Sequence, residues 1–168
     1  MAKRVRFFDG QLLTAADFEV EQTYHLEKRR LHNRLLHGVG IVEGLEVTED
    51  DSPSSGVVVS PGFALDGFGN EIVVDRPVHL DVSPCGQDQC FVTLRYTENE
   101  TDAVPTPNRT SEFSRVTEGF SVATAADDPG QDGSSQILSL GRLIRQDDRW
   151  LVDAGYSLCH VQAKTHRD

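Results

Sequence analysis

Three cysteines and a histidine are the side chains of this sequence best suited to metal chemistry. Four residues separate Cys85 from Cys90, and Cys159 is followed directly by His160. If the strands that carry them converged, a Cys3His zinc site and a metal-dependent hydrolase would be conceivable. The spacing is loose, however, and two adjacent residues rarely ligate one ion, so ordinary buried or strand-end thiols are favoured. We therefore expect neither a metal nor a cofactor.

Histidines in the N-terminal third raise a second metal hypothesis. His25 and His32 are seven residues apart, which on an α-helix separates their side chains by about 10.5 Å, too far to share one ion. His32 and His37 would point about 140° apart at 100° per residue. We interpret all three as surface or half-buried histidines, with an ion on a symmetry axis between copies as the alternative.

Paired carboxylates and glycine turns complete the search for chemistry. The pairs Asp50-Asp51, Asp127-Asp128 and Asp147-Asp148 occur in turn-like contexts, where Asp binds the local backbone. The segment Asp66-Gly67-Phe68-Gly69-Asn70 lacks the Walker lysine and the spaced carboxylates of an EF-hand, and it predicts a hairpin turn. No Gly-x-Ser-x-Gly nucleophile motif is present. The sequence therefore predicts a protein that is not an enzyme.

Charge excludes two classes of partner. The 168 residues carry 16 Lys and Arg against 27 Asp and Glu, a net charge of −11. Such a chain repels phosphate backbones and anionic membranes, so we expect no nucleic acid as a partner. The sequence has no apolar run of about 20 residues for membrane insertion and no signal-peptide core near its start. We expect synthesis and assembly in the cytoplasm.

A long N-terminal helix is the clearest element of the sequence. Thr14 is a capping residue with Asp17 at the third helical position, and Leu13 and Phe18 occupy the positions of a hydrophobic staple. No Pro or Gly follows until Gly38, so we predict a helix of about 22 residues. Its apolar side chains fall in two adjacent arcs, namely Val20, Tyr24, Leu31 and Leu35, and Phe18, His25, His32 and Leu36. We expect this flank to be covered only partly by the chain's own sheet and to be completed by other subunits.

Short strands are predicted for the rest of the chain. Runs rich in β-branched residues, separated by Gly, Pro, Asn and Asp, span 41–48, 56–60, 63–66, 71–75 and 78–82. A clearer strand covers 91–96, a long polar loop 97–111, and further strands 112–124, 136–145 and 150–158. The expected fold class is α+β, a long N-terminal helix followed by a mainly antiparallel β-sandwich or barrel-like domain. We divide the chain into 1–40 for oligomerisation and attachment, a β domain at 41–162 and a tail at 163–168.

A family pattern is carried by segments that include Phe7-Phe8-Asp9-Gly10-Gln11-Leu12-Leu13-Thr14-Ala15-Ala16-Asp17-Phe18, Arg29-Arg30-Leu31-His32-Asn33-Arg34-Leu35-Leu36-His37-Gly38, Ser60-Pro61-Gly62-x-Ala64-Leu65-Asp66 and Ser114-Arg115-Val116-x-Glu118-Gly119-Phe120. These segments resemble baseplate and tail-fibre-associated proteins of phage-tail-like, extracellular contractile injection systems. The resemblance implies a helix-then-β attachment module, commonly trimeric. The sequence has no long fibre repeat, so a connector is favoured over a complete fibre.

Taken together, the residues and the resemblance predict a structural, non-enzymatic connector of a contractile injection particle. The expected partners are two further copies in a homotrimer and baseplate or fibre proteins of the same particle, with release as part of an extracellular particle or virion. The interface residues we predict are Phe7, Phe8, Phe18, Tyr24, Leu31 and Leu35. The alternative is a carbohydrate- or surface-binding β-sandwich that uses the aromatic residues Tyr96, Trp150 and Tyr156.

Overall fold

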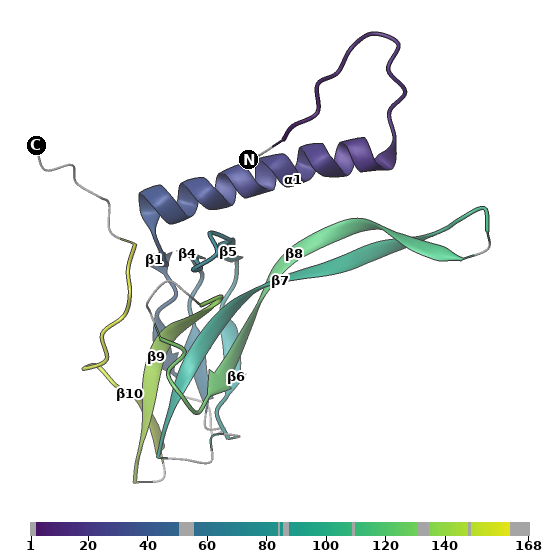
Figure 1. Cartoon of the computed structure of the whole chain (residues 1–168). Coiled ribbons are helices and arrows are strands. Elements are labelled where there is room, and N and C mark those ends of the chain that lie inside the picture. Colours follow the sequence, from purple (N-terminus) through teal and green to yellow (C-terminus); the bar gives the residue numbers. More distant parts are fainter. Residues whose placement is uncertain are drawn as a thin grey trace, which may run out of the picture.

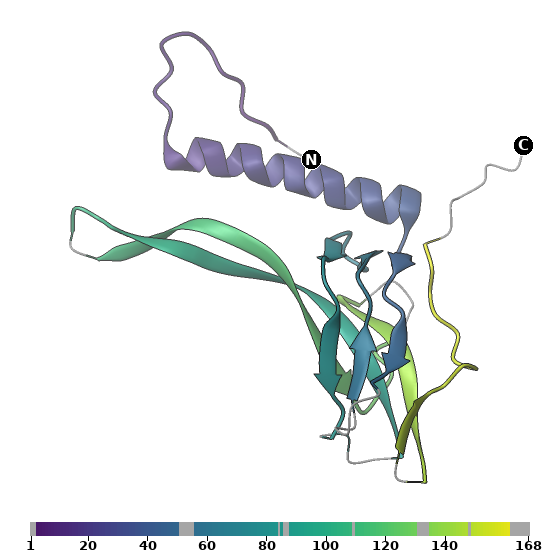
Figure 2. The same ribbon diagram turned by 180° about the vertical axis from the view of Figure 1, so that it is seen from behind.

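The computed structural model describes residues 3–50, 56–83, 85, 88–108, 110–130, 135–147 and 149–161. Within this part of the chain, one α-helix lies across the end of a strand-rich body, and the sheets form a half-barrel. Figures 1 and 2 show the helix on one side of the body and a long two-stranded ribbon that projects beneath it.

Three antiparallel sheets make up the body. The first has the order β1 (Gly40–Gly44), β4 (Gly62–Leu65), β5 (Glu71–Val74). The second has the order β2 (Val47–Glu49), β3 (Gly56–Val59), β6 (Val78–Asp81). The third has the order β10 (Arg149–Val152), β9 (Ile137–Gln146), β7 (Gln89–Pro105), β8 (Ser111–Ala125). The C-terminal segment adds a short parallel bridge between Ile41 and His160 at the free edge of β1.

The core lies between these sheets and follows from alternation along the strands. Val92 and Leu94 of β7 are fully buried, and Tyr96, next on that face, packs against the same cluster. They meet valines and isoleucines of the short strands, such as Val57 and Ile72. Alternate residues of a strand project from one face. Phe91 and Thr93 on the opposite face are buried as well, so this part of β7 is covered on both sides.

The α-helix α1 (Ala15–His32) begins where the sequence predicts. The backbone N–H of Thr14 donates to a carboxylate oxygen of Asp17 at 2.8 Å, and the Thr14 hydroxyl donates to the same oxygen at 2.7 Å. These two hydrogen bonds lower the pKa of the Asp17 carboxyl, because they favour its charged form. The reciprocal half of the capping box is therefore formed by Asp as it would be by Glu.

The predicted fold class, α+β with a long N-terminal helix, is wrong. Strands account for 49% of the structure, so the fold is mainly β, and the α-helix has 18 residues. It ends at His32 because the chain continues as a π-helical turn, η1 (Asn33–His37), where the Gly38 N–H donates to the Asn33 carbonyl. Asn33 is buried at this junction, and its side-chain amide donates to the Gly69 carbonyl at 3.0 Å and to Glu71 at 3.1 Å. Periodicity could not reveal this tertiary contact.

Two predictions about loops have opposite outcomes. The hairpin at Asp66–Asn70 is confirmed, since β4 pairs with β5 and the buried Asp66 carboxylate accepts hydrogen bonds from the backbone and side chain of Asn70. The prediction of a long polar loop at 97–111 is wrong, because β7 runs to Pro105 and β8 starts at Ser111. Polar residues suit a ribbon whose two faces both meet solvent, so they gave no alternating apolar signal.

Candidate functional site

The predicted interface residues lie on the N-terminal segment, on α1 and on η1, and most of them are exposed. We call residues 3–13 the arm, which rises from the start of α1 on the side away from β7 and β8 (Figure 1). Phe8 of the arm is 69% exposed, and Phe18 and Leu35 of the helical region are 53% and 60% exposed. Phe7 and Leu31 are also exposed, whereas Tyr24 is half-buried. Exposed large apolar side chains on neighbouring elements make this region the candidate binding surface.

Polar contacts, by contrast, hold α1 to its own body. Arg30 forms an ion pair with Glu98 of β7 at 2.8 Å, and Arg29 lies 3.6 Å from Glu118 of β8 and 3.8 Å from Glu71 of β5. None of the helix residues from Ala15 to His32 is buried. The apolar flank of the helix is therefore left largely uncovered within one chain, as the sequence predicts, because charged residues make the contact with the sheet.

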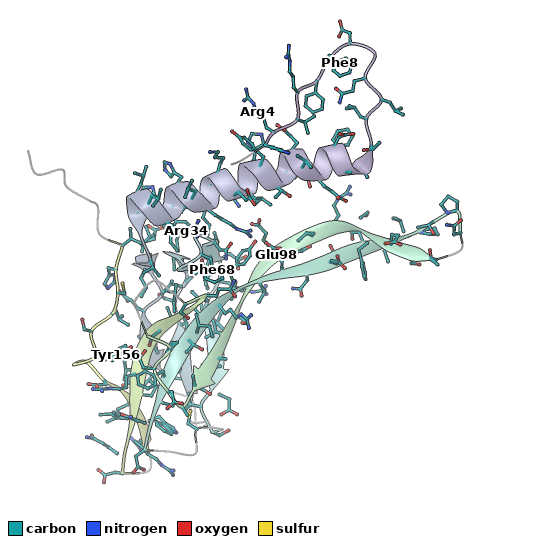
Figure 3. All side chains as sticks on the ribbon, in the orientation of Figure 1. Arg4, Phe8, Arg34, Phe68, Glu98 and Tyr156 are labelled. Carbon is teal, nitrogen blue, oxygen red and sulfur yellow. The ribbon has the colours of Figure 1, made fainter. Side chains whose placement is uncertain are left out.

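A surface cavity of ≈620 Å³ lies between the C-terminal half of α1, the hairpin after β4 and the middle of β7. Figure 3 shows three of its residues, Arg34, Phe68 and Glu98, beneath the helix. Tyr96 lines the cavity and its hydroxyl donates to Glu98 at 2.9 Å. Burial, followed by this bond and the charge of Glu118, raises the pKa of Tyr96, so the hydroxyl stays protonated as a donor.

One buried polar atom at this cavity lacks a partner. Asn70 is 7% exposed and lines the cavity, and its side-chain oxygen has no hydrogen-bond partner among the described residues. A buried acceptor without a partner costs free energy, so it is normally satisfied by water or by a ligand. The cavity thus combines charged groups of both signs with the half-exposed ring of Phe68.

The aromatic residues of the alternative hypothesis lie apart from one another. Tyr156 packs edge-on against Phe91, and its hydroxyl donates to Asp128 at 2.7 Å. Trp150 pairs with Arg145, level with the start of β7, whereas Tyr96 lies near the middle of that strand. Tyr156 is likewise distant from the cavity in Figure 3. The three rings therefore do not form one binding platform.

The cysteines are placed as structural thiols. Burial and the neighbouring Cys85 thiol raise the pKa of Cys90 to about 12, which keeps Cys90 protonated. Cys159 is half-buried and its thiol lies 3.4 Å from the Val39 carbonyl, beside β1. Throughout the described part of the chain, no cluster of His, Cys, Asp or Glu has the three members needed to hold a metal ion.

The helix-end histidines differ from the expectation. The rings of His32 and His37 lie 5.2 Å apart, although α-helical geometry would turn them about 140° from one another. The reason is the π-helical turn, in which each N–H bonds five residues back, so residues five apart come onto the same side. His25 instead contacts Glu21 at 3.0 Å.

Comparison with known proteins identifies structures that share the fold of this chain. No family model matches the sequence, and no curated protein sequence matches it. The structure is nevertheless similar to baseplate proteins of the type VI secretion system. A cryo-electron microscopy structure of the TssK-TssF-TssG baseplate subcomplex contains a chain with a TM-score of 0.57 and 15% identity, over 94% of this chain and 62% of that one. A structure of TssK from EAEC in complex with a nanobody gives a TM-score of 0.52 and 17% sequence identity, over 82% of this chain and 53% of that one.

The fold is thus one that this chain shares with TssK, a protein of the type VI secretion baseplate. The chain spans 41% to 62% of the length of these solved chains. The expectation of release in an extracellular particle or virion is wrong, because the similar structures belong to type VI secretion baseplates, which are not released particles. Within the described residues, no helix has the length and apolar character to cross a membrane.

Proposed function

We propose that this chain is a structural, non-enzymatic subunit of a contractile injection machine, where it connects proteins of the baseplate. The observation that carries the proposal is the TssK-like fold, which extends over 94% of the chain. TssK forms a baseplate subcomplex with TssF and TssG. By analogy, proteins of the TssF and TssG kind are the proposed partners of this chain.

The arm and the outer flank of α1 are the proposed docking surface. Phe7, Phe8, Phe18, Leu31 and Leu35 are exposed, with Leu31 at the cavity beside the helix, and the helix meets its own sheet through arginines. Burying such side chains removes apolar area from water, at about 25 cal/mol for each Å². Part of this surface serves a homotrimer in the proposal and part serves attachment to a baseplate or tail-fibre protein, which is the connector role that the sequence resemblance favours.

A binding experiment tests the connector role. The full chain is co-expressed with the TssF- and TssG-like proteins of the same source and recovered by a tag on the partners. We expect the unchanged chain to co-purify and the double variant Phe18→Ser/Leu35→Ser to lose binding, since both side chains are more than half exposed. Val73→Ser, which alters a valine 61% exposed on β5, is the matched control and should bind normally.

The mass in solution tests the homotrimer. Sedimentation equilibrium of the purified chain should give about three times the 18.6 kDa of one copy. Circular dichroism of each variant establishes that it is folded. Failure of the unchanged chain to co-purify with any baseplate partner would refute the connector role, and a mass of one copy at micromolar concentration would refute the trimer.

The cavity beside α1 supports a second candidate, binding of a carbohydrate. Sugars present hydroxyl donors and weakly apolar faces, which suit the Glu98 carboxylate and the Phe68 ring. Glycan-array binding by the full chain, abolished by Phe68→Ala and retained by Trp150→Ala, would favour it. Trp150 serves as the control because it lies on β10, away from the cavity.

A further inference from the structure

The outer part of the β7–β8 ribbon carries an unusual row of carboxylates. Glu98 lies directly opposite Glu118 in the strand pairing, the next pair on that face is Glu100 with Val116, and beyond Asp102 comes Val104 with Glu112. Like charges directly opposite one another destabilise a strand pair. A two-stranded ribbon is only marginally stable by itself, so this ribbon has reason to be covered.

The inner end of the row is already covered, and its partners are arginines. Arg30 pairs with Glu98 and Arg29 with Glu118, so two guanidinium groups of α1 neutralise the first carboxylate pair. We call the remainder, 99–105 and 111–117, the distal ribbon. There Glu100 and Glu112 form no ion pair within the described residues. Val104 and Val116 beside them are 44% and 61% exposed.

The arm has the complementary composition. It begins Lys3-Arg4-Val5-Arg6-Phe7-Phe8, with three cations and two aromatic rings in a chain whose net charge is −11. Among the described residues none of these three cations forms an ion pair. A local turn at Phe8–Gln11 shapes the arm, which otherwise extends from the body (Figure 1).

We propose that the arm of one copy covers the distal ribbon of a second copy. Arg4 and Arg6 would face Glu100 and Glu112, repeating the arginine–glutamate pairing that α1 makes further in, while Phe8, on the same side of an extended arm, would cover the exposed valines. Six extended arm residues span about 20 Å, and the four steps from Glu100 to Val104 span about 13 Å, so the arm is long enough.

A second copy is the proposed occupant because of where the arm lies. It rises on the side of α1 that faces away from β7 and β8, so reaching the ribbon of its own chain would require it to pass around the helix (Figure 1). A neighbouring copy can approach from either side. This inference does not depend on the baseplate role, which concerns other proteins.

Reciprocal charge reversal in the full chain tests the proposed contact between the arm of one copy and the distal ribbon of another. One variant reverses the arm, Arg4→Glu/Arg6→Glu, and another reverses the ribbon, Glu100→Arg/Glu112→Arg. All four residues are exposed, so the fold should tolerate the changes. In sedimentation velocity, each variant alone should self-associate at least about tenfold more weakly than the unchanged chain, because attraction becomes repulsion at two positions. An equimolar mixture should regain association, since each reversed arm meets a reversed ribbon only on the other chain.

The matched control is Glu43→Arg/Glu46→Arg, which adds the same charge at exposed positions around the end of β1 and should leave self-association unchanged. Weaker self-association of the unchanged chain in 0.5 M salt would further support ionic pairing. Reversed variants that associate like the unchanged chain would overturn the proposal. So would a mixture that stays dissociated, or an unchanged chain that is monomeric at all concentrations. Recovery of baseplate partners is measured separately, so failure of the arm–ribbon contact and failure of the connector role give different results.

Discussion

Replacing Gly69 by alanine tests the contact that docks α1 on the body. Gly69 has φ of 84°, and a Cβ built on it would lie 2.2 Å from the carbonyl oxygen of Arg30 in the helix. The left-handed conformation costs a residue with a Cβ about 1–2 kcal/mol. The steric overlap adds about 1–3 kcal/mol, as overpacking does in a filled core. We therefore expect Gly69→Ala to lower the free energy of unfolding by about 2–5 kcal/mol.

Gly130→Ala separates the two contributions. Gly130 has φ of 78° but no atom within 4 Å of its Cβ position, so only the conformational cost of about 1–2 kcal/mol remains. The assay is urea unfolding followed by circular dichroism, with equal m-values required for the comparison. Hydrogen exchange of the α1 amides should accelerate in Gly69→Ala alone, because the helix end is pushed from the hairpin. Equal destabilisation of both variants, with unchanged exchange, would refute the proposed contact.

Three further predictions concern charges and a thiol. A double-mutant cycle of Arg30→Ala and Glu98→Ala should give a coupling of about 0.2–1 kcal/mol that shrinks in 1 M salt, and zero coupling at low salt would contradict the ion pair. Burial raises the pKa of Cys90 to about 12, so iodoacetamide at pH 8 should label Cys90 only after unfolding. Peptide mass spectrometry measures the labelling, and rapid labelling of the native protein would disprove the burial of Cys90. The hydrogen bond from Arg142 lowers the pKa of the Asp153 carboxyl in the folded protein. The stability that the ionised Asp153 contributes is therefore present above the pKa of about 3.9 that an Asp has in the unfolded chain, and it is lost as the pH falls through the lower pKa of the folded protein. The variant Asp153→Asn should show a shallower loss of stability below about pH 4, and an unchanged acid slope would contradict the assignment.

Local signals in the sequence determined several elements of the fold. Thr14 and Asp17 set the start of α1 because a capping box involves residues three apart, and their hydrogen bonds are formed. The Asp66–Asn70 turn was equally readable, since Asp binds the backbone of its own turn. The β-branched and aromatic residues at 91–96 likewise identified part of β7 as a strand. The division into 1–40, 41–162 and 163–168 stays a prediction.

Tertiary structure decided what depends on residues distant in the sequence. The α-helix gives way to a π-helical turn at Asn33, whose side chain bonds Gly69 and Glu71 more than 30 positions away. The polar stretch 97–111 became a ribbon because two strands pair across it, and pairing requires no apolar alternation when both faces meet solvent. The sequence by itself determined where the helix begins. Only the fold decided that arginines hold the helix to the sheet and that the apolar side chains of the helix stay exposed.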